Sequence, residues 1–192
     1  MMRSAKTKFL GQAVIIAIDT SVSMGVRDVK PNRFEAAKRG ASVIVRTLIG
    51  GGVPTMVGVV AFYGHSMPVV DLTDSVEAVE RGLGSLQIQG RSTNLSEAVK
   101  DSYLLLKWAP AGYQKRIIVI TDGDYNEGYD PEVIASLLRG DGIRVDVLLV
   151  TEPSSGKLGK LRALAEMTGG KVYVARSLED VLKSASLIAT QD

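Results

Sequence analysis

Three polar segments of this sequence carry carboxylate and hydroxyl side chains at spacings that suit metal binding. Residues 19–23 read DTSVS and place Asp19, Ser21 and Ser23 on alternate positions directly after an apolar run. Residues 90–94, GRSTN, contain Thr93, and residues 121–124, TDGD, contain Asp122. The chain has no cysteine, and its single histidine lies outside these segments. Oxygen donors without nitrogen or sulfur favour a hard cation such as Mg²⁺ or Mn²⁺.

Each of these residues taken alone is also typical of an ordinary turn. Serine, threonine and aspartate side chains often cap helices or fix turns through hydrogen bonds to nearby backbone groups. Their shared position is what points to a site, because DTSVS and TDGD each follow an expected strand and GRSTN opens an expected helix.

Short runs rich in valine and isoleucine alternate with helical patterns along the chain. Near-continuous apolarity predicts buried strands at residues 13–19, 55–62, 116–121 and 144–151, and weaker runs predict edge strands at 66–70 and 171–175. Helices are expected at 33–49, 75–83 after an Asp74 cap, 95–108, 132–139, 156–168 and 178–188. This alternation predicts an α/β fold: a doubly wound, mainly parallel six-stranded sheet with helices on both faces.

One connection breaks the parallel pattern. Only residues 63–65 join the strands at 55–62 and 66–70, and three residues are too few for a parallel crossover. These two strands should therefore be antiparallel at one edge of the sheet. In such sheets ligands bind beyond the carboxyl ends of the strands, near the point where strand order reverses. DTSVS and TDGD both fall at such ends.

Length and composition exclude several classes of protein. The 192 residues fit a single domain, 1–192, with residues 1–11 expected as a flexible lead. The net charge of +2 comes from dispersed lysines and arginines, which argues against nucleic-acid and membrane-surface partners. The apolar run at residues 13–18 is too short for a signal peptide and ends on Asp19, so we expect a cytoplasmic protein.

The sequence resembles the von Willebrand factor type A (VWA) domain family, and the resemblance covers nearly the whole chain. The family's metal-ion-dependent adhesion site (MIDAS) combines a D-x-S-x-S motif with a later threonine and a later aspartate. Asp19, Ser21, Ser23, Thr93 and Asp122 match these positions, with Thr93 preferred over its neighbour Ser92. The resemblance also implies a sheet of strand order 3-2-1-4-5-6 with an antiparallel third strand.

The resemblance further implies a function without catalysis. In the family the hydroxyls bind Mg²⁺ or Mn²⁺ directly and the carboxylates often act through water, which leaves a position for an Asp or Glu of a partner protein. Intracellular members of the family often work with AAA+ ATPases of the MoxR or magnesium-chelatase type. The expected protein is therefore a metal-dependent interaction module, with such an ATPase as a candidate partner.

Two other functions stay open at this point. One is a Mg²⁺-dependent phosphohydrolase with Asp19 as the nucleophile, although Ser21 stands where a haloacid dehalogenase type would have a second aspartate. The other is an interaction domain that needs no metal. A calcium loop from Asp122 lacks its required glycine at Glu127, and His65 is expected as a surface turn residue.

Overall fold

The computed structural model describes residues 9–191 and contains one six-stranded sheet. The strands lie in the order β3-β2-β1-β4-β5-β6. Their bounds are β1 Gly11–Asp19, β2 Thr55–Phe62, β3 Ser66–Thr73, β4 Tyr113–Thr121, β5 Ile143–Leu149 and β6 Val172–Val174. All neighbours are parallel except β2 and β3, which pair antiparallel. The predicted fold class, strand order and antiparallel edge strand are confirmed.

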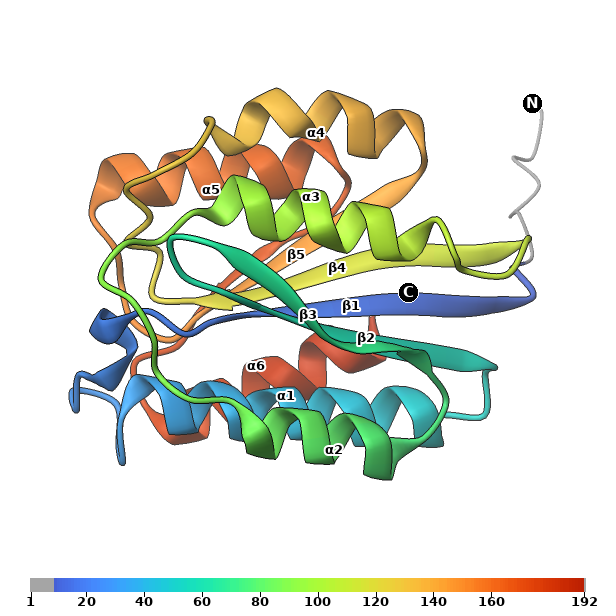
Figure 1. Cartoon of the computed structure of the whole chain (residues 1–192), viewed down its shortest axis with the longest axis horizontal. Helices are drawn as coiled ribbons and strands as arrows, with labels where there is room; N and C mark the ends of the chain where they lie inside the picture. The colour runs from blue at the N-terminus through green and yellow to red at the C-terminus, as the bar shows by residue number, and fades with distance from the viewer. Residues whose placement is uncertain (1–8, 192) are drawn as a thin grey trace, which may run out of the picture.

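Helices cover both faces of this sheet (Figure 1). One layer contains α1 Arg33–Gly50, α2 Val76–Ser85 and α6 Leu178–Thr190, and the other contains α3 Leu95–Leu106, α4 Pro131–Gly140 and α5 Ser155–Met167. A short 3₁₀ helix, η1 Val22–Gly25, follows β1 and was not predicted. Because β1, β4 and β5 all run the same way, the loops that follow them gather at one end of the sheet, on the left of Figure 1.

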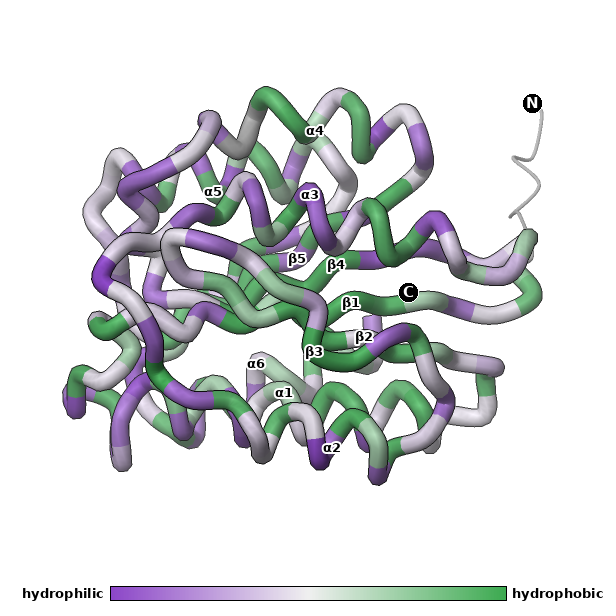
Figure 2. Tube along the Cα trace, in the orientation of Figure 1, coloured by the Kyte–Doolittle hydropathy of each residue, from purple (hydrophilic) through white to green (hydrophobic). Residues whose placement is uncertain are grey.

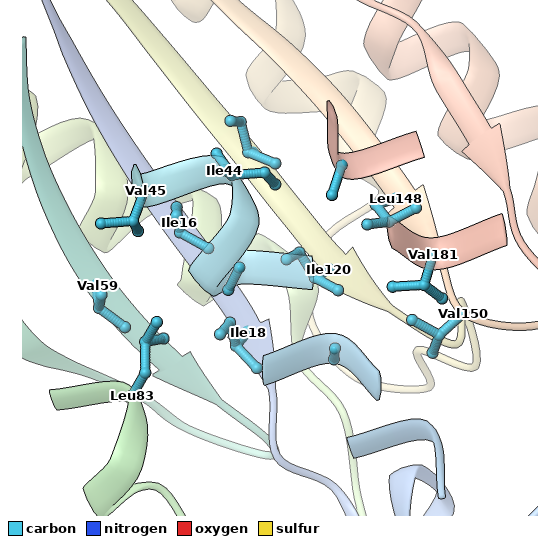
Figure 3. Close-up of a cluster of buried hydrophobic side chains, with 14 of the residues drawn as sticks. Ile16, Ile18, Ile44, Val45, Val59, Leu83, Ile120, Leu148, Val150 and Val181 are labelled. Atoms are coloured by element: carbon cyan, nitrogen blue, oxygen red, sulfur yellow. The ribbon is translucent and has the colours of Figure 1, made fainter. Parts of the chain in front are cut away.

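The core is divided by the sheet into two apolar layers. Successive side chains of β1 point to opposite faces, so Ile16 and Ile18 join one cluster while Ile15 and Ala17 join the other. Figure 3 shows Ile16 and Ile18 of β1 in the same cluster as Ile44 of α1. Burying each of these side chains stabilises the fold by about 1.5–3 kcal/mol. The central strands are mainly hydrophobic toward their carboxyl ends, although β4 begins with the polar residues 114–116, and the loops beyond those ends are more hydrophilic (Figure 2).

Side-chain caps fix where the helices near the site begin. Asn32 accepts a hydrogen bond from the Glu35 N–H at 2.8 Å, so that α1 starts at Arg33. Asn94 accepts one from the Glu97 N–H at 3.2 Å, so that α3 starts directly after the GRSTN segment. The predicted cap of α2, Asp74, is wrong, because Ser75 accepts the capping bond from the Ala78 N–H.

The expected flexible lead at residues 1–11 falls mainly on residues 1–8, which lie outside the described residues. Within its remainder, Leu10 donates its N–H to the Gly112 carbonyl at 3.0 Å, and Gly11 is already the first residue of β1. Across residues 9–191, each helix is too short or too polar to cross a membrane.

Candidate metal centre

Asp19, the last residue of β1, is held between two neighbouring strand ends. Its side chain is fully buried, and its Oδ1 accepts a hydrogen bond from the Ser21 N–H at 2.9 Å. Its Oδ2 accepts one from the Thr121 hydroxyl at 2.6 Å, at the end of β4. The parallel register, in which Ile18 lies opposite Ile120, brings these two strand ends together. Asp19 therefore has a fixed orientation at the carboxyl end of the sheet.

Burial makes the negative charge of Asp19 costly. Desolvation raises the pKa of this carboxyl from 3.8 to about 6, the nearby charge of Asp122 adds to the rise, and hydrogen bonds from Ser21 and Thr121 oppose it. Among residues 9–191, no lysine or arginine forms an ion pair with Asp19. A bound dication would favour the ionised carboxylate, since a metal ion is often the largest local charge in its site.

The hydroxyls of Ser21 and Ser23 lie side by side after β1. Their Oγ atoms are 3.1 Å apart, because the chain turns into η1 at Val22 and the Met24 N–H donates to the Ser21 carbonyl at 3.0 Å. The residue between Asp19 and Ser21 is directed elsewhere, since the Thr20 hydroxyl donates to the Phe62 carbonyl at 3.0 Å. The alternation read from the sequence thus describes this turn correctly.

Asp122 follows β4 and has a cation as its neighbour. Its Oδ1 accepts the Asp124 N–H at 3.0 Å, and its Oδ2 accepts a bond from Arg33 Nη1 at 3.0 Å. Arg33 also donates to both oxygens of Asp28, at 2.8 and 2.6 Å, and these bonds are the main reason that the pKa of Asp28 falls to about 2. Neither Arg33 nor Asp28 was predicted as a residue of this site. Arg33 lies 89 positions from Asp122, and no spacing pattern connects them.

Thr93 is positioned by hydrogen bonds from its backbone N–H and carbonyl to the segment after β4. Its N–H donates to the Asn126 side chain at 2.9 Å, and its carbonyl accepts the N–H groups of Asn126 and Glu127 at 3.0 and 3.1 Å. The start of the same loop bonds the end of β1, since the Val22 N–H donates to the Gly90 carbonyl at 3.0 Å. Thr93 is 2% exposed. The loop that carries Thr93 thus contacts both the segment after β1 and the segment after β4.

Two glycines leave the space that this loop needs. Gly90 has a φ of +62°, and a Cβ there would collide with the Tyr63 ring. Gly128 has a φ of +87°, and a Cβ there would collide with the side chains of Asn94 and Ser96. Positive φ and close contact both exclude most other residues at these positions. The two glycines therefore allow the loop with Thr93 to pack against its neighbours.

The donor set fits a hard divalent cation and depends on the hydroxyls. Within residues 9–191, no group of three or more His, Asp or Glu side chains could hold a metal. In an octahedral shell with metal–oxygen distances of about 2.0–2.1 Å, neighbouring ligand oxygens lie about 2.8–3.0 Å apart. The 3.1 Å spacing of the Ser21 and Ser23 oxygens is close to that value. Asp19, which accepts the Ser21 N–H, and Asp122, whose charge acts on Asp19, would supply negative charge to such an ion.

The acidic loop after Asp122 is partly neutralised by α5. Lys157 pairs with Asp124, and Lys160 pairs with Asp130 at 2.6 Å. No spacing pattern in the sequence indicates these pairs. Loop residues 125–130 and the start of α5 also line a cavity of about 510 Å³. The surface next to the candidate site is thus a hollow with both signs of charge.

The geometry gives little support to the phosphohydrolase interpretation. Both oxygens of Asp19 already accept hydrogen bonds, and the buried side chain offers no open path to a substrate phosphorus. His65 is exposed in the β2–β3 turn, with its ring edge-on to Tyr63 at 5.8 Å, as expected of a surface residue. Neither residue is arranged as a nucleophile with an adjacent base.

Comparison with known proteins identifies the family of this chain. The family model described as von Willebrand factor type A domain matches residues 14–124, more than half of the sequence. The chain therefore belongs to the von Willebrand factor type A domain family, a family of protein-interaction modules. This confirms the predicted resemblance to the family.

Individual relatives are similar across most of the chain. A UPF0353 protein of Mycolicibacterium paratuberculosis is 26% identical over 93% of this chain and 60% of its own length. The chain thus spans about three fifths of that curated relative. The crystal structure of BatB from Bacteroides thetaiotaomicron is 27% identical, with a TM-score of 0.79 over 92% of this chain and 96% of that one. Proximal thread matrix protein 1 of the mussel byssus, with a zinc-occupied MIDAS motif, shares the fold at 20% identity, with a TM-score of 0.75 over 93% of this chain and 46% of that one.

Proposed function

We propose that this domain binds Mg²⁺ or Mn²⁺ through Asp19, Ser21, Ser23, Thr93 and Asp122 and uses the ion to hold an acidic residue of a partner protein. The observation that carries this proposal is the pair of hydroxyl oxygens 3.1 Å apart after β1, beside two buried carboxylates. The proposed role is binding without catalysis. The mussel protein supports it, because a solved structure with the same fold has a metal in its MIDAS motif.

The chain's own residues have separate roles in this proposal. Ser21, Ser23 and Thr93 present hydroxyl oxygens, while Asp19 and Asp122 supply charge from positions fixed by their other hydrogen bonds. A divalent ion bound there would supply a Lewis-acidic position for a partner's Asp or Glu carboxylate. Such a contact is strengthened by partial removal from water, because opposite charges attract more strongly at lower effective dielectric.

The cavity beside the site is the proposed place for the partner residues that flank the acidic one. It is lined by Tyr125 and Tyr129 from the loop after β4 and by Lys157 and Lys160 from α5. Tyrosine is enriched in protein-binding surfaces, and the rim of such surfaces is polar. For the partner itself we propose an AAA+ ATPase of the MoxR or magnesium-chelatase type, on the analogy with intracellular relatives.

Titration calorimetry with Mn²⁺ tests the metal site. We expect saturable binding of one ion per chain, weakened more than about tenfold in Asp19→Ala, as is usual when a group that supports a metal site is removed. Asp74→Ala is the matched control, since Asp74 is exposed just after β3, where Thr73 pairs with Val57 at the other end of β2. An absence of Mn²⁺ binding by the wild-type domain would refute the proposal.

A second experiment tests the partner chemistry. The immobilised domain is offered a MoxR-type ATPase in Mn²⁺ and in EDTA, with Asp19→Ala in parallel. We expect capture only by the wild-type domain in Mn²⁺, and loss of capture when the responsible Asp or Glu of the ATPase is changed to alanine. Capture that persists in EDTA and in Asp19→Ala would instead identify a metal-independent interaction domain.

A further inference from the structure

Arg33 places a permanent positive charge on a carboxylate of the proposed metal site. The residue is the first of α1, and its side chain is 16% exposed. Its Nη1 donates to Asp122 Oδ2 at 3.0 Å, and the Asp122 side chain is fully buried. A guanidinium stays protonated under all conditions in which the protein folds. The negative charge of Asp122, which would attract a metal ion, is therefore already paired with the positive charge of Arg33.

Asp28 holds the same guanidinium from the other side. Its two oxygens accept bonds from Arg33 Nε and Nη2 at 2.8 and 2.6 Å, a bidentate arrangement that is among the stronger side-chain contacts. The Thr151 hydroxyl also bonds Asp28, at 3.3 Å. Arg33 would thus keep a partner if its single bond to Asp122 were lost. The bidentate pair holds Arg33 in place, and the bond to Asp122 is the one that can be given up.

We propose that Arg33 competes with the divalent cation for Asp122 and thereby lowers the metal affinity of the site. This inference rests on the proposed function, because it concerns the same metal centre. A positive charge beside Asp122 repels an incoming dication and offsets part of the attraction of the two site carboxylates. It also neutralises Asp122 while no metal is bound, so that the buried carboxylates are less costly to the fold.

Two consequences separate this role from a purely structural one. Replacing Arg33 with glutamine removes the charge, so the metal-free domain should become less stable while its affinity for Mn²⁺ rises. A residue that only positioned Asp122 would give the opposite change in affinity, because a misplaced carboxylate binds metal less well. Arg33→Lys keeps the charge with fewer donors, so its affinity should stay close to that of the wild type.

Calorimetric titration of Mn²⁺ into the wild type, Arg33→Gln and Arg33→Lys tests the inference. We expect Arg33→Gln to bind Mn²⁺ about tenfold more tightly, the order expected for one unit charge at short range in a partly buried site. Its melting temperature should also rise more on addition of Mn²⁺ than that of the wild type. Arg46→Gln is the matched control, because Arg46 lies on the same helix and pairs with Glu80 at 2.9 Å, away from the site. Arg33→Met, which keeps an aliphatic stem, is the second neutral variant if Arg33→Gln fails to fold.

The outcomes distinguish this inference from the proposed function. Unchanged or weaker binding by the neutral variants, with normal binding by the wild type, overturns the competition and leaves the metal site intact. Binding by the neutral variants alone would support the competition for Asp122, while the absence of binding by the wild type would refute the proposed function. No binding by any of the proteins overturns both.

Discussion

Two arginine–aspartate pairs of this domain differ in their place in the fold and in the number of hydrogen bonds that hold them. Arg116 and Asp146 lie in the middle of β4 and β5, where Arg116 Nε donates to Asp146 Oδ2 at 2.6 Å and Arg116 Nη2 donates to the Ile188 carbonyl at 2.8 Å. Asp146 Oδ1 also accepts the Lys171 N–H at 2.9 Å. Arg33 and Asp122 share one bond of 3.0 Å at a strand end. The first pair lies in the interior of the domain, and the second lies at the carboxyl end of the sheet.

The comparison shows how one kind of contact serves two purposes. Asp146 pairs with Arg116 at 2.6 Å and also with Arg144 at 3.0 Å. Removing this buried carboxylate leaves Arg116 without a charged partner, so the contact is fixed once the chain has folded. Arg33 has Asp28 as a second partner, and Asp122 has the proposed metal ion as one. With such an ion bound, the pair of Arg33 and Asp122 would change partners without leaving an unpaired charge behind, and we call it the exchangeable pair.

The interior pair is expected to give the largest effect when it is broken. Asp146→Ala leaves Arg116, which is 4% exposed, without its carboxylate, and should lower the free energy of unfolding by about 3–5 kcal/mol. Urea denaturation followed by circular dichroism measures this loss. A loss below about 1 kcal/mol, the range of exposed pairs, would show that the two arginine–aspartate pairs are equivalent.

Asp19 extends the comparison to a buried carboxylate near Asp122. Among the described residues, Asp19 forms no ion pair with an arginine. Its pKa of about 6 in the folded domain exceeds 3.8, so its contribution to stability is fully present below pH 3.8 and is lost as the pH rises through about 6. At pH 7.5 in EDTA, Asp19→Asn should therefore be more stable than the wild type by about 1–3 kcal/mol.

Urea denaturation of both proteins at pH 7.5 and pH 4 measures this difference. It should shrink toward zero at pH 4, where the carboxyl of the wild type is protonated in the folded domain. The gain in stability should come with a loss of Mn²⁺ binding, because the amide lacks the charge. A variant less stable than the wild type at pH 7.5 would mean that the hydrogen bonds of Asp19 outweigh its desolvation.

Breaking the exchangeable pair from the aspartate side should affect metal binding more than folding. Asp122→Ala removes a proposed supporting carboxylate and leaves Arg33 paired with Asp28, so Mn²⁺ affinity should fall by about 10–100-fold. The free energy of unfolding should change by less than for Asp146→Ala. Mn²⁺ titration and urea denaturation of the same preparation measure both quantities. Wild-type Mn²⁺ affinity in Asp122→Ala would remove this residue from the proposed site.

Asp28 should give the smallest effect. Asp28→Asn takes away the carboxylate that shares the charge of Arg33, so the guanidinium acts more fully on Asp122 and Mn²⁺ affinity should fall about two- to threefold. Because Asp28 is exposed, the free energy of unfolding should change by less than about 1 kcal/mol. Titration in buffers of low and high ionic strength measures the effect, which should be smaller in high salt. Tighter Mn²⁺ binding in this variant would contradict the competition by Arg33.

The elements of the fold were predictable because their signals are local. Residues 13–18 are apolar without interruption, and a strand covered on both faces needs such a run. The three-residue connection before Ser66 required an antiparallel strand. The cap of α2 was assigned one residue too early, since Asp74 and Ser75 have nearly equal capping preference and only the structure distinguishes them. The short η1 helix has no periodic signal of its own.

The site was predictable only in part. The alternation of Asp19, Ser21 and Ser23 describes the turn after β1, and the structure adds the 3.1 Å spacing of the two hydroxyls. The bond between Arg33 and Asp122 depends on where α1 packs against the sheet, which no residue pattern specifies. For the same reason the pairs of Lys157 and Lys160 with the acidic loop were not expected. Whether the five residues hold a metal stays a prediction.

The glycines around Thr93 have a consequence for how this domain tolerates sequence change. At Gly90 and Gly128 any side chain would have to displace Tyr63 or Asn94, and the backbone has a positive φ at both positions. Exchange of a serine for a threonine at a proposed ligand position keeps a hydroxyl, whereas no other amino acid reproduces these two residues. In a survey of natural variants, we therefore expect the strictest conservation of this region at two positions that have no side chain to offer a metal or a partner.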